Sequence, residues 1–226
     1  MTSPGLPAAA PPQAMTLFGY WRSSAAYRVR LALAYKRLEY NTIDIDLRSG
    51  MQSAANYTAA NPQGLVPMLQ FGDTQLVQSL AIIEYIDEVY PAPPLLPGDA
   101  LGRARVRSAA QIITADIHPL NNLRVLKYLK DPLEQPQDSI DRWARHWITG
   151  GLEALEAFAT RYGGRFLYGD HLTLADLCLV PQLYNARRVN TDLLKFPRIC
   201  AIDTVVNAED FSHAAQPERH RMRIER

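Results

Sequence analysis

Cysteine, long apolar runs and net charge are all scarce in this chain of 226 residues. Its two cysteines, Cys178 and Cys200, form neither a disulfide framework nor a metal-binding spacing, and they favour a reducing cytoplasm. No apolar run approaches the roughly 20 residues that a membrane-spanning helix needs. The formal net charge of +1 gives no bulk electrostatic case for nucleic-acid binding. We therefore expect a cytoplasmic, metal-free protein of one or two domains, with neither a membrane nor a nucleic acid as partner.

Proline marks the expected boundaries. Residues 1–14, MTSPGLPAAAPPQA, lack the basic start and apolar core of a signal peptide, so we expect a disordered extension. Residues 91–98, PAPPLLPG, are the clearest linker in the chain. We expect one domain over residues 15–90, a second over residues 99–214, and a frayed, arginine-rich C-terminus over residues 215–226.

The first domain alternates strand and helix patterns. A short apolar strand is followed by a helix that Ser23 or Ser24 caps, and then by a second strand over residues 40–47. A helix between two short strands predicts a parallel β-α-β crossover. A loose helix, a hairpin and a further helix complete the order β-α-β-α-β-β-α, which matches a thioredoxin-like domain. The second domain has helical periodicity throughout, interrupted at Pro119, so we expect an α/β domain followed by an all-α bundle.

Residues 61–79, NPQGLVPMLQFGDTQLVQS, place extended backbone just before the start of a helix. A cis Val66–Pro67 bond would leave the Val66 backbone N–H and C=O facing outward, free to pair with an extended peptide. Ser79 is a natural N-cap, and the first N–H groups of its helix form an anion site. The two features together suit a small peptide that carries a carboxylate. The alternative is an ordinary hairpin followed by a capped helix.

The motifs NPxxxVP and QSxAIIEY in this stretch resemble the glutathione site of glutathione transferases. The segment RSSAAYRVRLAL, residues 22–33, is similar to the zeta-class signature, with Ala25 in place of a cysteine and Tyr27 in place of a tryptophan. The likeness covers roughly residues 15–211. It implies the two-domain transferase architecture, a homodimer and glutathione as cofactor. The cofactor-binding residues that it implies are Ser23, Gln52, Val66, Gln78, Ser79, His118 and Asn122.

The zeta class includes maleylacetoacetate and maleylpyruvate isomerases, so the resemblance implies a glutathione-dependent cis–trans isomerase of a maleyl keto acid in aromatic amino acid catabolism. A hydroxyl at Ser23 or Ser24 and the positive end of its helix would favour a thiolate on bound glutathione. Arg22 and Arg188 are expected to bind the acidic substrate. Because Ala25 replaces the signature cysteine, a protein thiol is not expected to act. The alternatives are a zeta-type transferase that conjugates or dehalogenates small electrophiles, and a non-catalytic binding module.

Several polar and aromatic residues are instead expected to be structural. Arg28 and Arg30 are expected on a solvated or interdomain helix face, Asp176 in a helix-capping box, and the Trp143/Trp147 pair in the core. Two site candidates have structural alternatives as well. His118 suits a core or interface histidine, and Arg188 suits a structural ion pair.

Overall fold

The structure, a computed structural model, describes residues 14–221. The predictions made for residues 1–13 and 222–226 lie outside these described residues. The chain forms two compact units: one contains the residues up to Pro93 together with the C-terminal segment that begins at Pro217, and the other is Pro94–Gln216. In the described part of the chain, no helix has the length and apolar character that crossing a membrane requires.

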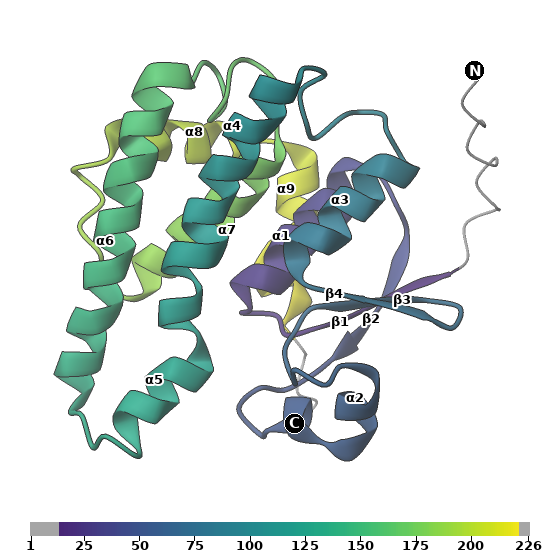
Figure 1. The fold of residues 1–226 in the computed structure, drawn as a ribbon, viewed down its shortest axis with the longest axis vertical. Helices are drawn as coiled ribbons and strands as arrows, with labels where there is room; N and C mark the ends of the chain where they lie inside the picture. Colours follow the sequence, from purple (N-terminus) through teal and green to yellow (C-terminus); the bar gives the residue numbers. More distant parts are fainter. Residues whose placement is uncertain (1–13, 222–226) are drawn as a thin grey trace. The chain divides into compact units, whose positions relative to one another are not determined.

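The first unit is built on a four-stranded mixed sheet with the strand order β2-β1-β3-β4 (Figure 1). Strands β1 and β2 are parallel and α1 connects them, whereas β3 runs antiparallel to both β1 and β4. The thioredoxin-like prediction is therefore confirmed. The bounds are β1 Met15–Gly19, α1 Ser24–Tyr35, β2 Tyr40–Asp44, β3 Met68–Phe71, and β4 Thr74–Val77.

The second strand is shorter than the sequence predicts, because it ends at Asp44 and not at Leu47. Its parallel partner β1 stops at Gly19, whose carbonyl oxygen accepts a last hydrogen bond from Ile45 N at 2.7 Å. Beyond that point no ladder partner is in register, so the alternating pattern continues in the sequence without a strand to pair with.

Helices cover both faces of this sheet. Helices α1 and α3 (Ser79–Val89) lie side by side on one face, and α2 (Ala55–Ala60), after a 3-10 turn at Met51–Ser53, lies on the other (Figure 1). On the α2 face, Met68 lies opposite Phe18 and Val77 in register and packs in one apolar cluster with Tyr57. On the other face, the buried Lys36 side chain at the end of α1 pairs with Asp87 of α3. This ion pair joins the C-terminal ends of α1 and α3.

The second unit is helical in the residues described. The predicted run through Pro119 divides: α4 passes into a π-helical turn at Ile112–Ile117 and a 3-10 turn at Pro119–Asn121 before α5 begins. A proline that lacks its N–H explains the division. The helices are α4 Ala100–Gln111, α5 Leu123–Lys130, α6 Gln137–Tyr162, α7 Leu174–Arg188, α8 Pro197–Asn207, and α9 Asp210–Ala215.

Helix α7 is the core helix of this unit, and its start is fixed by the predicted capping box. The carboxylate of Asp176, fully buried, accepts hydrogen bonds from Thr173 N and Oγ at 2.8 Å and from Leu167 N at 2.7 Å. Burial raises the pKa of Asp176 to about 6, although these hydrogen bonds oppose the shift. After α9 the chain joins the first unit, where Pro217–His220 forms a 3-10 helix instead of the frayed end expected there.

Candidate active site

Ser23 caps α1, and its hydrogen bonding distinguishes it from Ser24. Its Oγ accepts a hydrogen bond from Ala26 N at 3.2 Å, so the oxygen satisfies one helix N–H while the hydroxyl hydrogen can be donated elsewhere. Ser24 is the first residue of the helix and is only 7% exposed. Of the two serines that the sequence left as alternatives, Ser23 therefore has the better placed hydroxyl for a ligand at the positive end of α1.

The loop before β3 holds a length of backbone ready for pairing. Leu65 O accepts hydrogen bonds from Asn61 Nδ2 at 2.6 Å and Tyr57 Oη at 2.7 Å, and these fix the loop. The next peptide bond, Val66–Pro67, is cis. Within the described residues, the Val66 N–H and C=O make no hydrogen bond. Both groups remain free to pair with an extended peptide.

Gln52 lies against the same loop. Gly64 has a φ of +59°, and a Cβ built there would come within 2.9 Å of the Gln52 carbonyl oxygen. The close approach therefore requires glycine at position 64. The side-chain Oε1 of Gln52 is buried and has no hydrogen-bond partner in the described structure. A buried acceptor of this kind is costly unless a donor reaches it, so it favours a ligand that brings an N–H or O–H group.

The start of α3 differs from the sequence prediction. Gln78, and not Ser79, is the N-cap residue; it has a φ of 70°, and its Nε2 donates to Gln63 Oε1 at 2.7 Å. A non-glycine residue in this conformation is strained, and such strain is often found at ligand sites. Ser79 is the first residue of α3 and is 7% exposed, beside helix N–H groups that suit an anion.

Arg28 and Arg30 are buried, so the solvated alternative of the predicted solvated or interdomain helix face is wrong. Only 1% of Arg28 and 2% of Arg30 is exposed. Arg28 Nη1 donates to Ser79 Oγ at 3.3 Å, and Arg30 Nη2 donates to the Trp21 carbonyl oxygen at 3.1 Å. The sequence signal that was missed is that α1 is apolar around its whole circumference, so a charged residue in its middle is also buried.

Arg22 stands just before the serines and is stacked on its neighbour. Its guanidinium carbon lies 5.2 Å from the centroid of the Trp21 ring, and that of Arg221 lies 5.5 Å from the same centroid. Stacking through the guanidinium face leaves N–H groups at its edge for a carboxylate. Arg221 was not among the predicted site residues, because the sequence gives no sign that the C-terminal segment reaches Trp21.

The remaining candidates belong to the second unit. His118 follows the π-helical turn, where its N–H donates to Ile113 O at 2.8 Å. A Cβ at Gly151 of α6 would lie 2.2 Å from Ile117, so this glycine lets α6 pack directly on the turn. Asn122 caps α5, and its side chain accepts from Arg124 N at 3.1 Å. These contacts fix the backbone on either side of Pro119 and leave the predicted cofactor roles of His118 and Asn122 as predictions.

The two arginines at the end of α7 differ in their contacts. Arg187 Nη2 pairs with the buried carboxylate of Asp203 at 2.6 Å, which gives it a structural role. Arg188 is the last residue of the helix and is exposed. Its predicted role in binding a substrate carboxylate stays a prediction.

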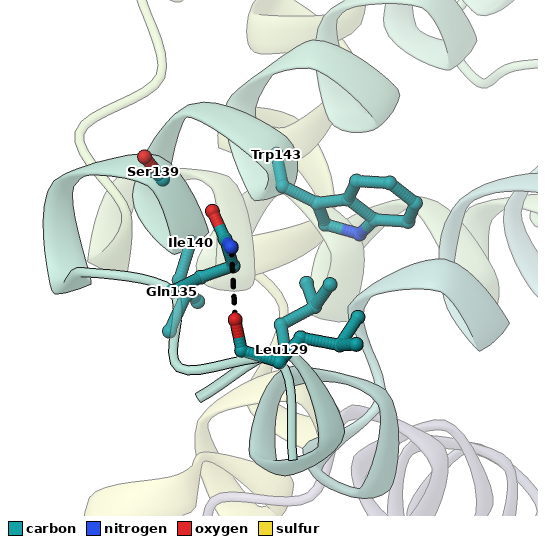
Figure 2. Close-up of a pocket in the computed structure, with 6 residues that line it drawn as sticks. Leu129, Gln135, Ser139, Ile140 and Trp143 are labelled. Carbon is teal, nitrogen blue, oxygen red and sulfur yellow. Dashed lines mark hydrogen bonds between the residues drawn. The ribbon is translucent and has the colours of Figure 1, made fainter. Parts of the chain in front are cut away.

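A separate hollow lies between the end of α5 and the start of α6 (Figure 2). Its volume is about 270 Å³, and its lining is mainly Leu129, Leu133, Ile140 and Trp143. None of the predicted site residues lines it, and no titratable side chain does either.

The Trp143/Trp147 pair is not in the core. The two rings pack edge to face, and Trp147 is 37% exposed, so the prediction that this pair lies in the core is wrong. The described residues also contain no His, Cys, Asp and Glu group arranged to hold a metal ion.

Comparisons with known proteins identify the family. The family described as glutathione S-transferase, N-terminal domain, matches residues 13–88, and the glutathione S-transferase C-terminal domain matches residues 137–205. A probable maleylacetoacetate isomerase of Vibrio cholerae is 44% identical over 206 residues, which are 90% of this chain and 96% of the relative.

Two solved structures have a similar fold, and one of them contains glutathione. A holo maleyl pyruvate isomerase, a bacterial zeta-class glutathione S-transferase, has a TM-score of 0.87 at 42% identity and covers 89% of this chain and 96% of its own. The maleylacetoacetate isomerase of Anaeromyxobacter dehalogenans, with glutathione bound in its active site, has a TM-score of 0.83 at 43% identity. It covers 92% of this chain and 97% of its own.

Proposed function

Because this chain belongs to the zeta class of the glutathione S-transferase family, we propose that it is a glutathione-dependent cis–trans isomerase that converts a maleyl keto acid to its fumaryl isomer. Relatives named maleylacetoacetate isomerase and maleyl pyruvate isomerase match this chain along nearly their full length, and this match supports the reaction class. The observation in this chain that carries the proposal is the unpaired Val66 backbone, together with two helix starts that each have a serine at the first or capping position.

The residues present fit glutathione, a tripeptide with a carboxylate at each end. The unpaired N–H and C=O of Val66 would pair with its backbone, and the partnerless Gln52 Oε1 would accept from one of its N–H groups. Ser79 and the first N–H groups of α3 would hold the γ-glutamyl carboxylate, with Gln78 beside them. With glutathione bound in this way, its thiol is proposed to lie near the start of α1.

Bound glutathione supplies a thiolate that adds to the cis double bond and leaves again after rotation about that bond. The task of this chain is to favour the thiolate and to hold an acidic substrate. Ser23 can donate its hydroxyl hydrogen to the sulfur while its oxygen caps α1, and the helix dipole adds positive potential at the same place. Arg22 is held by Trp21 with its edge N–H groups available for a carboxylate, and Arg188 is proposed to bind a second one.

The experiment that tests the function measures loss of maleylacetoacetate or maleylpyruvate absorbance with substoichiometric glutathione. We expect many turnovers for each glutathione, because the thiol is released at the end of each cycle. Turnover that stops after one equivalent would instead identify a conjugating transferase. If no maleyl acid turns over while glutathione still binds, the isomerase proposal is wrong and the binding-module alternative stands.

We further propose that the protein is a cytoplasmic homodimer that acts in the breakdown of aromatic amino acids or related compounds. The family resemblance supports the dimer, and the two free cysteines suit a reducing compartment. Light scattering that gives a monomer at micromolar concentration would refute the dimer, and recovery of the native protein outside the cytoplasm would refute the location. Genes for a ring-cleaving dioxygenase and a fumaryl-acid hydrolase beside this gene would support the pathway.

A further inference from the structure

Helices α1 and α3 are joined at their starts by one buried hydrogen bond. Arg28 Nη1 on α1 donates to Ser79 Oγ, the first residue of α3, at 3.3 Å, and the two residues are 51 positions apart in the sequence. Both are largely withdrawn from solvent, with 1% of Arg28 and 7% of Ser79 exposed. The contact is therefore a fixed internal one and not a surface contact that solvent screens.

The chemistry of arginine decides which way the serine hydroxyl points. A guanidinium has only donors, so in this contact Ser79 Oγ must accept. The hydrogen of the same hydroxyl then has to lie on another side of the oxygen. Ser79 has no further side-chain hydrogen bond among the described residues, and the neighbouring groups at a helix start are N–H donors. The hydroxyl is therefore oriented to donate to an acceptor that is not part of the chain, as a carboxylate would be.

The charge of Arg28 acts in the same direction. A guanidinium keeps its proton at all physiological pH values, and a hydroxyl that accepts from a cation becomes a stronger donor. The buried positive charge also adds to the potential at the start of α3. In addition, Arg28 lies one helical turn after Ser24, near the start of α1. Its hydrogen bond therefore connects Ser79 to the helix whose N-cap is Ser23.

We propose that Arg28 is a positioning residue of the glutathione site: it orients and polarises the Ser79 hydroxyl for the γ-glutamyl carboxylate and ties that subsite to the helix that carries the thiol-contacting serine. The inference rests on the proposed glutathione binding and adds to it a residue that does not touch the ligand.

The test is a double-mutant cycle read by calorimetry with glutathione. Arg28→Gln and Ser79→Ala should each weaken binding by about 10- to 100-fold, because each removes a charge-assisted hydrogen bond from the path to the carboxylate. The double variant should bind about as weakly as Ser79→Ala alone, since Arg28 acts through that hydroxyl. Arg28→Lys, which keeps the charge and a donor, should recover part of the loss.

A second ligand distinguishes positioning from general structural damage. Glutathione whose γ-glutamyl carboxylate is converted to an amide should bind Arg28→Gln and the wild type with similar affinity, whereas damage to the fold would weaken both ligands. Arg30→Gln is the matched control, because it removes an equally buried arginine two positions along α1 that contacts Trp21 and not Ser79. Any loss of glutathione affinity in Arg30→Gln should add to the loss in Ser79→Ala when the two substitutions are combined.

The outcomes separate the two proposals. A wild type that binds glutathione, combined with additive losses for Arg28→Gln and Ser79→Ala, overturns the positioning role and leaves the proposed function intact. Equal weakening of both ligands in Arg28→Gln and in Arg28→Lys also overturns it. A wild type that does not bind glutathione at all overturns both. Circular dichroism of every variant, at a temperature well below its unfolding midpoint, ensures that each affinity is that of the folded protein; if Arg28→Gln does not fold, Arg28→Lys carries the cycle.

Discussion

Replacing Ser23 with alanine removes a helix cap and a thiol contact in one step, and the two effects can be measured apart. The lost cap is the hydrogen bond from Ala26 N to Ser23 Oγ. Loss of an N-cap side chain costs about 1 kcal/mol of folding free energy, which lowers the unfolding midpoint by about 2–4 °C in a protein of this size. Thermal unfolding without ligand measures this part.

The second effect concerns the bound thiol. A hydrogen bond to a charged acceptor contributes roughly 1.5–3 kcal/mol, and 1.36 kcal/mol corresponds to one pKa unit, so Ser23→Ala should raise the pKa of bound glutathione by about 1–2 units. A free thiol has a pKa near ~8.5, and we expect the wild-type complex to titrate below neutrality. Ultraviolet absorbance of the thiolate, followed against pH in the complex, measures the shift.

Two further variants make this test specific. Ser23→Thr keeps a hydroxyl and a good N-cap, so both the unfolding midpoint and the titration should stay close to the wild type. If Ser24→Ala shifts the titration and Ser23→Ala does not, the thiol contact belongs to Ser24. If both alanine variants titrate like the wild type, neither serine stabilises the thiolate, and the assignment is refuted.

Two other predictions follow from the second unit. Arg188→Ala should lower kcat/KM for the maleyl acid by about 10- to 100-fold, mainly through KM if the residue only anchors a carboxylate, while exposed Arg142→Ala serves as the control; equal kinetics for the two variants would count against the role. The raised pKa of Asp176, about 6 when folded, means that its carboxyl binds a proton more tightly in the folded than in the unfolded chain. Its contribution to the free energy of unfolding is therefore largest below about pH 4 and falls by roughly 3 kcal/mol as the pH rises past 6. Urea denaturation across this range should show the fall in the wild type but not in Asp176→Asn, and parallel pH curves would contradict it.

Local sequence patterns were sufficient for the architecture of the chain. The crossover over residues 15–44, the hairpin and the division at Pro119 each depend on residues close together in sequence, and the structure shows all three. The end of the second strand was placed too late because it depends on where its partner β1 stops, at Gly19. The end of β2 is therefore determined by its pairing with β1 and not by the residues of β2 alone.

The site could be predicted only in part from the sequence, because it too depends on contacts between distant segments. The motif residues could be named, but the hydrogen bond between Arg28 and Ser79 joins residues 51 positions apart, which no periodicity encodes. Likewise, Gln78 takes the N-cap position through a positive φ that its residue type does not favour. The exposed edge of Trp147 depends on how α6 packs, which its spacing alone could not show.

The stacking of Arg221 on Trp21 also bears on how this protein is made. The first compact unit contains residues from both ends of the described chain, so it is not a continuous stretch of sequence. On the ribosome, residues 14–93 emerge long before Pro217–Arg221, and the first domain must wait for the whole helical unit to be synthesised before its last contacts can form. A fragment cut at the proline-rich linker would lack those contacts permanently.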